Sequence, residues 1–240
     1  MRNTFFRFKE FTICQERAAM KVTTDSCLFG AWMAQRLQDE PADTRLLDIG
    51  AGTGLLSLMV AQQCAGQTDA VEIDAGACAQ ALENIAASPW KERIKVYHND
   101  LRKWVPPRSY DIIFSNPPFY EQELTGADEG RNIAHHSSHF SLISLLDFIH
   151  SHLEPGGRFY LLLPFKRKEE LLKQVQQHPL FVHEMCEVKQ SVVHQPFRIL
   201  VAGGRDQAPA IDTEMSICEA DKKTYTAAFQ QLLKPYYLYL

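Results

Sequence analysis

Arg45-Leu46-Leu47-Asp48-Ile49-Gly50-Ala51-Gly52-Thr53-Gly54 joins a short apolar run to a turn that contains three glycines. The apolar run predicts a buried strand, and the segment after the turn predicts an amphipathic helix that ends near Cys64. Glycine lets the backbone turn tightly and lets a ligand approach it closely. A strand, a glycine turn and a helix in this order indicate a ligand site in an α/β sheet.

The spacing Asp-x-Gly-x-Gly-x-Gly differs from the GxGxxG of dinucleotide-binding folds, in which a pyrophosphate lies on the helix N-terminus. Here the motif begins with the carboxylate of Asp48, which repels phosphate and attracts an ammonium group. We therefore expect Asp48, Gly50, Gly52 and Gly54 to bind a ligand with a cationic amino-acid end. The alternative is a glycine-rich turn that binds nothing.

Two more acidic residues are expected at the carboxyl ends of neighbouring strands. Glu72 lies 24 residues after Asp48, close to where doubly wound folds place the acid that binds ribose hydroxyls. Asp100 follows the next predicted strand and can accept a hydrogen bond from the adenine amino group of a cofactor. The alternatives are a solvated strand end for Glu72 and an ordinary loop residue for Asp100.

The tetrapeptide Asn116-Pro117-Pro118-Phe119 ends an apolar strand predicted over residues 110–115. Neither proline can donate to a sheet, and the residue before a proline is biased to an extended conformation, so we expect a rigid loop. The loop offers the Asn116 amide oxygen, the Pro117 carbonyl and the ring of Phe119. Two acceptors and an aromatic ring suit a planar group that carries an NH₂. The alternative is a strand that ends in an Asn-Pro turn.

Strands alternate with helices through most of the chain, which predicts a doubly wound, Rossmann-like α/β sheet. We expect this sheet to be mostly parallel. A hairpin-like crossing between its later strands predicts an antiparallel strand near the C-terminus. Further strands are predicted near residues 69–74, 93–97, 158–163, 181–188, 197–203 and 211–218. Further helices are predicted near residues 24–37, 75–88, 138–153, 166–178 and 221–234. We expect a single domain over residues 1–240.

Composition narrows the functional classes. The net charge of −4, from 25 basic and 29 acidic residues, argues against a protein covered with nucleic-acid-binding charge but allows a local basic patch. The six cysteines include no CxxC pair, which predicts reduced thiols in a cytoplasmic protein. No leader-like or membrane-length apolar segment is present, so we expect neither secretion nor membrane insertion. His135 and His139 have helical spacing but lack further ligands, so we expect no metal.

The first 21 residues carry five basic and two acidic side chains, interleaved with phenylalanines. Phosphate attraction and base stacking make this mixture suitable for RNA. The alternative is an edge hairpin whose phenylalanines pack on the core. We expect Lys9, Arg17 and Lys21 to contact RNA, together with Arg131 in the polar segment 120–138, which suggests a substrate loop.

These motifs together resemble the class I methyltransferases that depend on S-adenosylmethionine. FRFKEF at residues 6–11 and MKVTTDSCLFGAW at residues 20–32 further resemble the bacterial N6-adenine methyltransferases that modify valine tRNA at the adenine just 3′ of the anticodon. The resemblance spans roughly the first 160 residues. It implies that residues 1–40 form an extension, including Thr24, that covers the methionyl end of the cofactor.

The same resemblance implies direct methyl transfer from a sulfonium to adenine N6 in a tRNA. We expect the enzyme to be a monomer. Asn116 and Pro117 would accept hydrogen bonds from the amine, and Phe119 would stack on the base. One alternative is a glutamine N5-methyltransferase that acts on a protein such as a release factor, although the 47 residues before Asp48 are too few for the helical domain of those enzymes. The other is a non-catalytic RNA chaperone that binds S-adenosylmethionine.

Overall fold

The computed structural model describes residues 4–18, 20–117 and 141–240. The strands are β1 Phe5–Arg7, β2 Thr12–Cys14, β3 Arg45–Ile49, β4 Gln67–Glu72, β5 Ile94–His98, β6 Tyr110–Ser115, β7 Leu153–Pro164, β8 Phe181–Ser191, β9 Pro196–Gly204 and β10 Ile211–Cys218. The helices are α1 Thr24–Arg36, α2 Leu55–Gln63, α3 Ala75–Ala86, η1 Lys91–Arg93, α5 Leu142–His152, η2 Phe165–Arg167, α6 Lys168–Gln177 and α7 Ala227–Leu233.

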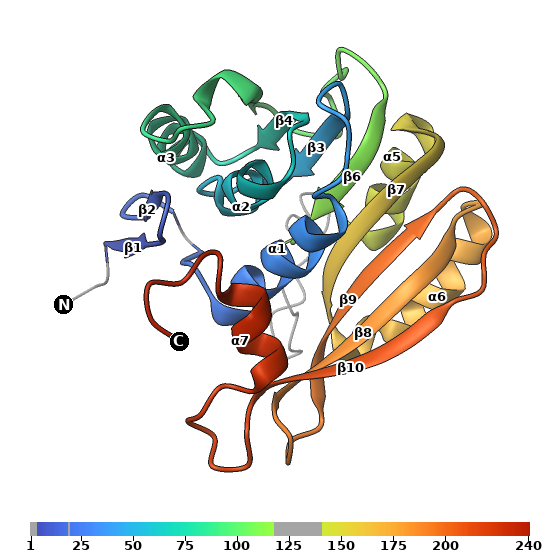
Figure 1. Ribbon diagram of the computed structural model, residues 1–240. Helices are drawn as coiled ribbons and strands as arrows, with labels where there is room; N and C mark the ends of the chain where they lie inside the picture. The colour runs from blue at the N-terminus through green and yellow to red at the C-terminus, as the bar shows by residue number, and fades with distance from the viewer. Residues whose placement is uncertain (1–3, 19, 118–140) are drawn as a thin grey trace, which may run out of the picture.

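The larger sheet has eight strands in the order β10-β8-β9-β7-β6-β3-β4-β5 (Figure 1). Strands β3 to β7 pair in parallel. Strand β9 is antiparallel to both β7 and β8, and β10 is parallel to β8. The described sheet is therefore mostly parallel with one reversed strand near the C-terminus, which confirms the predicted fold class.

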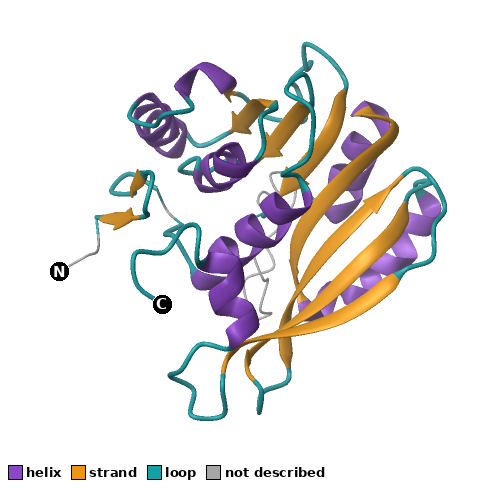
Figure 2. Cartoon of the chain, viewed as in Figure 1, coloured by secondary structure: helices purple, strands orange, loops and turns teal. Residues whose placement is uncertain are grey.

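Helices cover both faces of this sheet (Figure 2). Helices α1, α2, α3 and α7 contribute to one hydrophobic cluster, and α5 and α6 contribute to a second. Neighbouring residues of one strand face opposite clusters, as Leu46 and Leu47 do in β3 and Ile112 and Ile113 do in β6. Because these strands are buried on both sides, they read in the sequence as continuous apolar runs.

The strand order reverses between β3 and β6. From β3 the chain continues on one side to β4 and β5, and it returns on the other side with β6 and β7. Ile49 at the end of β3 pairs with Ser115 at the end of β6. Open α/β sheets bind ligands outside the carboxyl ends of the strands at such a reversal. The glycine turn and Asn116 both lie there.

The N-terminal hairpin and the C-terminal tail lie together beside α2 (Figure 1). Strands β1 and β2 form a separate two-stranded sheet. Phe8 and Phe11 of this hairpin are buried, and their rings stack with centroids 4.5 Å apart. Tyr236 is also buried, and its hydroxyl donates to the Met59 carbonyl at 3.0 Å. Phe8 and Phe11 therefore pack on the core, as the hairpin alternative predicts.

The N-cap of helix α1 is Thr23, and the helix begins at Thr24, as predicted. Thr24 or Asp25 is a reasonable cap from the sequence, but Thr23 is the N-cap, and its hydroxyl accepts from the Ser26 amide at 3.4 Å. Three consecutive cap-forming side chains make this position ambiguous in the sequence. Asp25 instead pairs with Arg198 at 2.8 Å.

Two other element ends differ from the prediction. Strand β7 begins at Leu153 and includes Pro155-Gly156-Gly157, whereas the predicted strand begins at residue 158, and the pairing register with β6 shifts at this point. Gly156 has φ of 75°, which glycine adopts readily. Helix α7 begins only at Ala227, because residues 221–226 form turns and Thr226 caps the helix.

Within residues 4–18, 20–117 and 141–240, no helix is both long enough and apolar enough to cross a membrane. All six cysteines are free, and Cys27, Cys64, Cys78 and Cys186 are buried.

Candidate active site

The glycine turn after β3 has a backbone that only glycine adopts without strain. Gly50, Gly52 and Gly54 have φ values of 72°, 57° and 82°. The Gly50 and Ala51 amides donate to the Val71 carbonyl at 2.9 and 3.1 Å, which ties the turn to β4. A Cβ atom at Gly50 or Gly52 would meet no heavy atom within 4 Å. The turn thus presents open backbone at the carboxyl edge of the sheet.

Asp48 lies beneath this turn and is fully buried. Its Oδ2 accepts a hydrogen bond from the Ser57 hydroxyl at 2.6 Å. Its Oδ1 has no hydrogen-bond partner among the described residues. The pKa of this carboxyl is raised from 3.8 to about 7, chiefly by burial and to a smaller extent by the negative charge of Glu72, against the lowering effect of the hydrogen bond from Ser57. A buried acid with an unpaired oxygen is costly unless a ligand or a charge compensates it.

Glu72 holds the turn from its outer side. Its Oε2 accepts from the Gly52 amide and its Oε1 from the Asp74 amide, both at 2.8 Å. These two bonds fix the carboxylate at the end of β4, where it is 8% exposed. Each oxygen keeps a second lone pair for a ligand hydroxyl. Asp74 caps α3 by accepting a hydrogen bond from the Ala77 amide at 2.8 Å.

Asn116 follows β6 directly across from the glycine turn. The Ser115 hydroxyl donates to the Ile49 carbonyl at 2.7 Å, which ties the ends of β6 and β3 together. The Asn116 Nδ2 donates to the Ser26 hydroxyl at 3.0 Å. Its Oδ1 has no partner in the part of the chain that the structure describes, and Pro117 is buried. Pro118, Phe119 and Arg131 lie outside the described residues.

An open glycine turn, a ribose-compatible acid and an Asn-Pro loop thus meet at one edge of the sheet. The family model described as "Methyltransferase small domain" matches residues 30–193. The chain is 39% identical to the tRNA1(Val) (adenine(37)-N6)-methyltransferase of Dyadobacter fermentans, over 99% of this chain and 98% of that protein. It is 37% identical to the protein of the same name from Pectobacterium carotovorum subsp. carotovorum, over 100% and 96% of the two chains.

The chain belongs to this methyltransferase family.

Solved structures agree with this at the level of the fold. A predicted O-methyltransferase from Agrobacterium tumefaciens superposes with a TM-score of 0.61 at 16% identity, over 88% of this chain and 96% of that chain. The glycopeptide N-methyltransferase MtfA complexed with S-adenosylmethionine superposes with a TM-score of 0.53 at 12% identity, over 74% and 88%. The sheet of this methyltransferase is therefore of the class I type.

The methyltransferase uses S-adenosylmethionine as its methyl donor, and the residues present fit this cofactor. The open backbone at Gly50 and Gly52 provides room at the turn. Below the turn, Asp48 Oδ1 has no partner among the described residues, and a cationic amino-acid end would favour the charged form of this carboxyl, whose pKa burial raises to about 7. Glu72 would supply two oxygens for ribose hydroxyls. These residues would hold the cofactor, with Asp48 acting from beneath the turn because it is fully buried.

Asp100 lies after β5 at the same edge of the methyltransferase sheet. Arg102 donates to both of its oxygens, with the shortest contact at 2.7 Å, and this bonding lowers the pKa of the Asp100 carboxyl. The carboxylate is therefore charged, but an adenine amino group would have to share it with Arg102. Its proposed contact with adenine stays a prediction. Thr24 is exposed in the first turn of α1, and its cofactor contact also stays a prediction.

The predicted RNA-binding side chains of the N-terminal segment all have internal partners. Lys9 Nζ donates to the Lys234 carbonyl at 2.5 Å, and Lys21 Nζ donates to the Gln15 carbonyl. Arg17 pairs with Glu83 of α3. The partners of the two lysines are neutral carbonyls, whereas the carboxylate of Glu83 offsets the charge of Arg17. Their contact with RNA stays a prediction.

Three polar residues support this site but could not be assigned a role from the sequence. Ser57 bonds Asp48 and carries the one hydroxyl in the apolar run Leu55–Ala61 of α2. Its isolation in that run is the one feature of the sequence that sets it apart. Asn84 of α3 is buried and bonds both the amide and the carbonyl of Cys14 and the carbonyl of Thr53, each at 2.9 Å. Ser26 bonds Asn116 across 90 residues of sequence.

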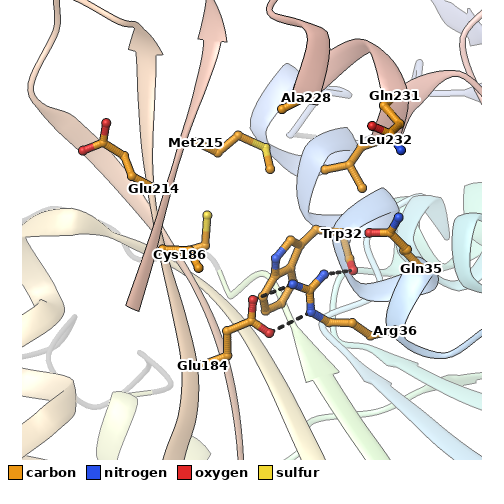
Figure 3. Close-up of a pocket in the computed structure, with 11 residues that line it drawn as sticks. Trp32, Gln35, Arg36, Glu184, Cys186, Glu214, Met215, Ala228, Gln231 and Leu232 are labelled. Carbon is orange, nitrogen blue, oxygen red and sulfur yellow. Dashed lines mark hydrogen bonds and ion pairs between the residues drawn. The ribbon is translucent and has the colours of Figure 1, made fainter. Parts of the chain in front are cut away.

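A pocket of about 270 Å³ lies away from this edge, between α1, α7 and strands β8 and β10 (Figure 3). Arg36 stacks on Trp32 with its guanidinium carbon 4.0 Å from the ring centroid, and it pairs with Glu184 at 2.5 Å. Ten residues of α1, or about 15 Å of helix, separate Arg36 from Ser26 at the site. This pocket is not the cofactor site. No group of three or more His, Cys, Asp or Glu side chains in the described ranges is arranged to hold a metal.

Proposed function

We propose that this methyltransferase transfers the methyl group of S-adenosylmethionine to N6 of an adenine in tRNA. The target would be adenine 37, just 3′ of the anticodon, in valine tRNA. The observation that carries the proposal is full-length similarity to relatives that bear the name tRNA1(Val) (adenine(37)-N6)-methyltransferase. Asn116 lies beside the glycine turn, where its side chain would act on the amine that receives the methyl group.

S-adenosylmethionine, when bound, supplies a methyl group on a sulfonium sulfur. The adenine N6 lone pair is delocalised into the ring, so the amine is a weak nucleophile. The free Oδ1 of Asn116 and the carbonyl of Pro117 are acceptors that would align this amine and stabilise the positive charge that develops on it. Phe119 would stack on the extruded base. The proton lost from the nitrogen passes to water, so no protein base is needed.

The proposed enzyme acts as a monomer in the cytoplasm, where tRNA is modified. Asp48, Glu72 and Asn116 all come from one chain and meet at one sheet edge, so a second copy is not needed to assemble these residues. Lys9, Lys21, Arg17 and Arg131 would contact tRNA phosphates.

The test is methyl transfer by the purified protein from S-adenosylmethionine with a labelled methyl group. Unmodified tRNA and a release factor with an unmodified glutamine are offered as separate acceptors. We expect label in tRNA, and we expect Asn116→Ala to lower turnover by roughly two to three orders of magnitude. Cofactor affinity measured by calorimetry should change little, because Asn116 is proposed to face the substrate. Label in the release factor alone would contradict the proposal, as would full turnover by the variant.

A further inference from the structure

Ser26 joins the N-terminal segment to the proposed catalytic loop. It lies in the first turn of α1, where the residue is only 5% exposed. Its hydroxyl is 3.0 Å from Asn116 Nδ2 and 2.7 Å from the hydroxyl of Thr23, the N-cap of the same helix. Two partners on one buried hydroxyl restrict its orientation.

The Asn116 amide turns its Nδ2 end to Ser26, and the arrangement in which Ser26 donates to Thr23 enforces this orientation. A serine hydroxyl has one proton, and when Ser26 donates that proton to Thr23 it can only accept from Asn116. It then bonds the Nδ2 end of the amide and leaves Oδ1 for another donor. With the amide reversed, an NH₂ group would face the substrate NH₂, and two donors cannot bond each other.

The backbone around Asn116 is fixed independently of Ser26. The Ser115 hydroxyl anchors one side to Ile49, and the buried Pro117 fixes the other side. The terminal amide torsion of an asparagine is nevertheless broad, so a fixed backbone does not fix the amide. Among the described residues, Ser26 makes the one hydrogen bond to the Asn116 side chain.

We infer that Ser26 is a positioning residue that orients the Asn116 amide with its oxygen toward the substrate amine. The inference rests on the proposed function, because it assumes that Asn116 acts on the acceptor nitrogen. It assigns α1 a part in the transfer step besides any contact with the cofactor.

Ser144 of α5 provides a matched control. Its hydroxyl is 3.0 Å from that of Ser141, the N-cap of α5, and its amide donates to the Ser141 hydroxyl at 3.1 Å. Ser144 therefore has the same relation to its cap as Ser26 has to Thr23, without any described bond to an asparagine. Ser144→Ala measures what loss of a hydroxyl beside a helix cap costs the fold at a half-buried position, whereas Ser26 is buried.

The experiment compares Ser26→Ala, Ser26→Thr, Asn116→Ala and the Ser26→Ala/Asn116→Ala double variant, with whichever acceptor the wild type methylates. We expect Ser26→Ala to lower kcat roughly ten- to a hundredfold, with cofactor Kd changed by less than about twofold. Ser26→Thr should recover most of the rate, and Ser144→Ala should keep it. The double variant should be no slower than Asn116→Ala, because Ser26 acts through Asn116.

Unchanged kcat in Ser26→Ala overturns the inference. So does an equal rate loss from Ser26→Ala in the presence and absence of Asn116, or an Asn116→Ala variant with full activity. A wild type that methylates a protein and not tRNA refutes the proposed function but leaves this double-variant comparison valid, because a glutamine carboxamide offers the same NH₂.

A second measurement does not depend on turnover. In a nitrogen–proton NMR spectrum of the cofactor-free protein, the Asn116 side-chain amide is identified by its absence from Asn116→Ala. We expect Ser26→Ala to shift this signal pair, and Ser144→Ala to leave it in place. An Asn116 amide signal that is the same in wild type and Ser26→Ala would show that the hydrogen bond is not formed, and the inference would fail.

Discussion

Asp48 couples the stability of the cofactor-free protein to pH. Its pKa is raised from 3.8 to about 7, chiefly by burial, so the folded state holds a proton that the unfolded state releases. Stability from this group is therefore present below about pH 4 and is lost as pH rises to about 7. We expect Asp48→Asn to remove this loss. Urea unfolding at intervals between pH 4 and 8 measures this dependence of stability on pH. Parallel curves of unfolding free energy against pH for wild type and variant would contradict the assignment.

Asp111 gives a comparison of opposite sign. Its pKa is lowered, chiefly by the hydrogen bonds from the Arg45 side chain, so its contribution is lost as pH falls and not as it rises.

Glu72 is the residue on which cofactor affinity should depend most clearly. Glu72→Gln replaces one of its two acceptor oxygens with a donor that faces the Gly52 or the Asp74 amide. Loss of a charged hydrogen bond costs roughly 1.5–3 kcal/mol, so affinity for S-adenosylmethionine should fall about tenfold or more. Calorimetry measures this affinity. The control is Glu83→Gln, at the residue that pairs with Arg17, and this variant should bind the cofactor as the wild type does. Equal affinity in Glu72→Gln would remove Glu72 from the cofactor site.

At the scale of single residues, the sequence predicts the site residues that lie close together in the chain. Asp48, Gly50, Gly52 and Gly54 form one continuous motif, and the structure places that motif at the carboxyl edge as predicted. Asn84 and Ser26 could not be predicted, because each bonds a residue that is 70 or 90 positions distant. Such pairs appear only when the chain is folded.

Among the elements, the buried amide of Asn84 links the N-terminal hairpin to α3 and to the glycine turn. Asn84 of α3 satisfies the amide and carbonyl of Cys14 at the end of β2 and the carbonyl of Thr53 in the glycine turn. Asn84→Ala leaves the buried Thr53 carbonyl unpaired, at a cost of roughly 1–3 kcal/mol, and removes the partner of the part-buried amide and carbonyl of Cys14. We expect unfolding free energy to fall by about 2 kcal/mol or more, measured in urea. Exposed Gln177 of α6 is the control, because Gln177→Ala should change stability by less than about 0.5 kcal/mol. Similar stability of both variants would mean that Asn84 does not hold the hairpin.

The predicted boundaries of strands and helices agree with the structure where a single type of sequence signal marks them. Strands β3 and β10 match their predicted residues, since each is bounded by turn-forming residues. Strand β7 is longer than predicted, because pairing with β6 resumes after the irregularity at Pro155-Gly156-Gly157. In the sequence, the phenylalanines of the N-terminal segment are compatible with both a packed hairpin and an RNA-binding surface. The buried positions of Phe8 and Phe11 show that these two rings pack on the core.

For the whole molecule, a local positive charge on an acidic chain predicts a salt-dependent contact with tRNA. We expect the triple substitution Lys9→Gln, Arg17→Gln and Lys21→Gln to weaken tRNA binding in all sequence contexts. Each lost phosphate contact should make the log–log salt dependence shallower by roughly 0.7–0.9. Filter binding over a salt series measures this, with cofactor affinity as the control. Since Glu83 offsets the charge of Arg17, the two lysines should account for most of the change. A slope equal to that of the wild type would place the RNA contacts elsewhere.

The central claim is methylation of one adenine in one tRNA, and it is tested by mass spectrometry of valine tRNA isolated from cells with and without this protein. Digestion to oligonucleotides locates the modified position. We predict N6-methyladenosine at position 37 when the protein is present and unmodified adenosine when it is absent, with Asn116→Ala matching the absence. N6-methyladenosine at that position in cells that lack the protein, or its absence from cells that contain it, would contradict the account.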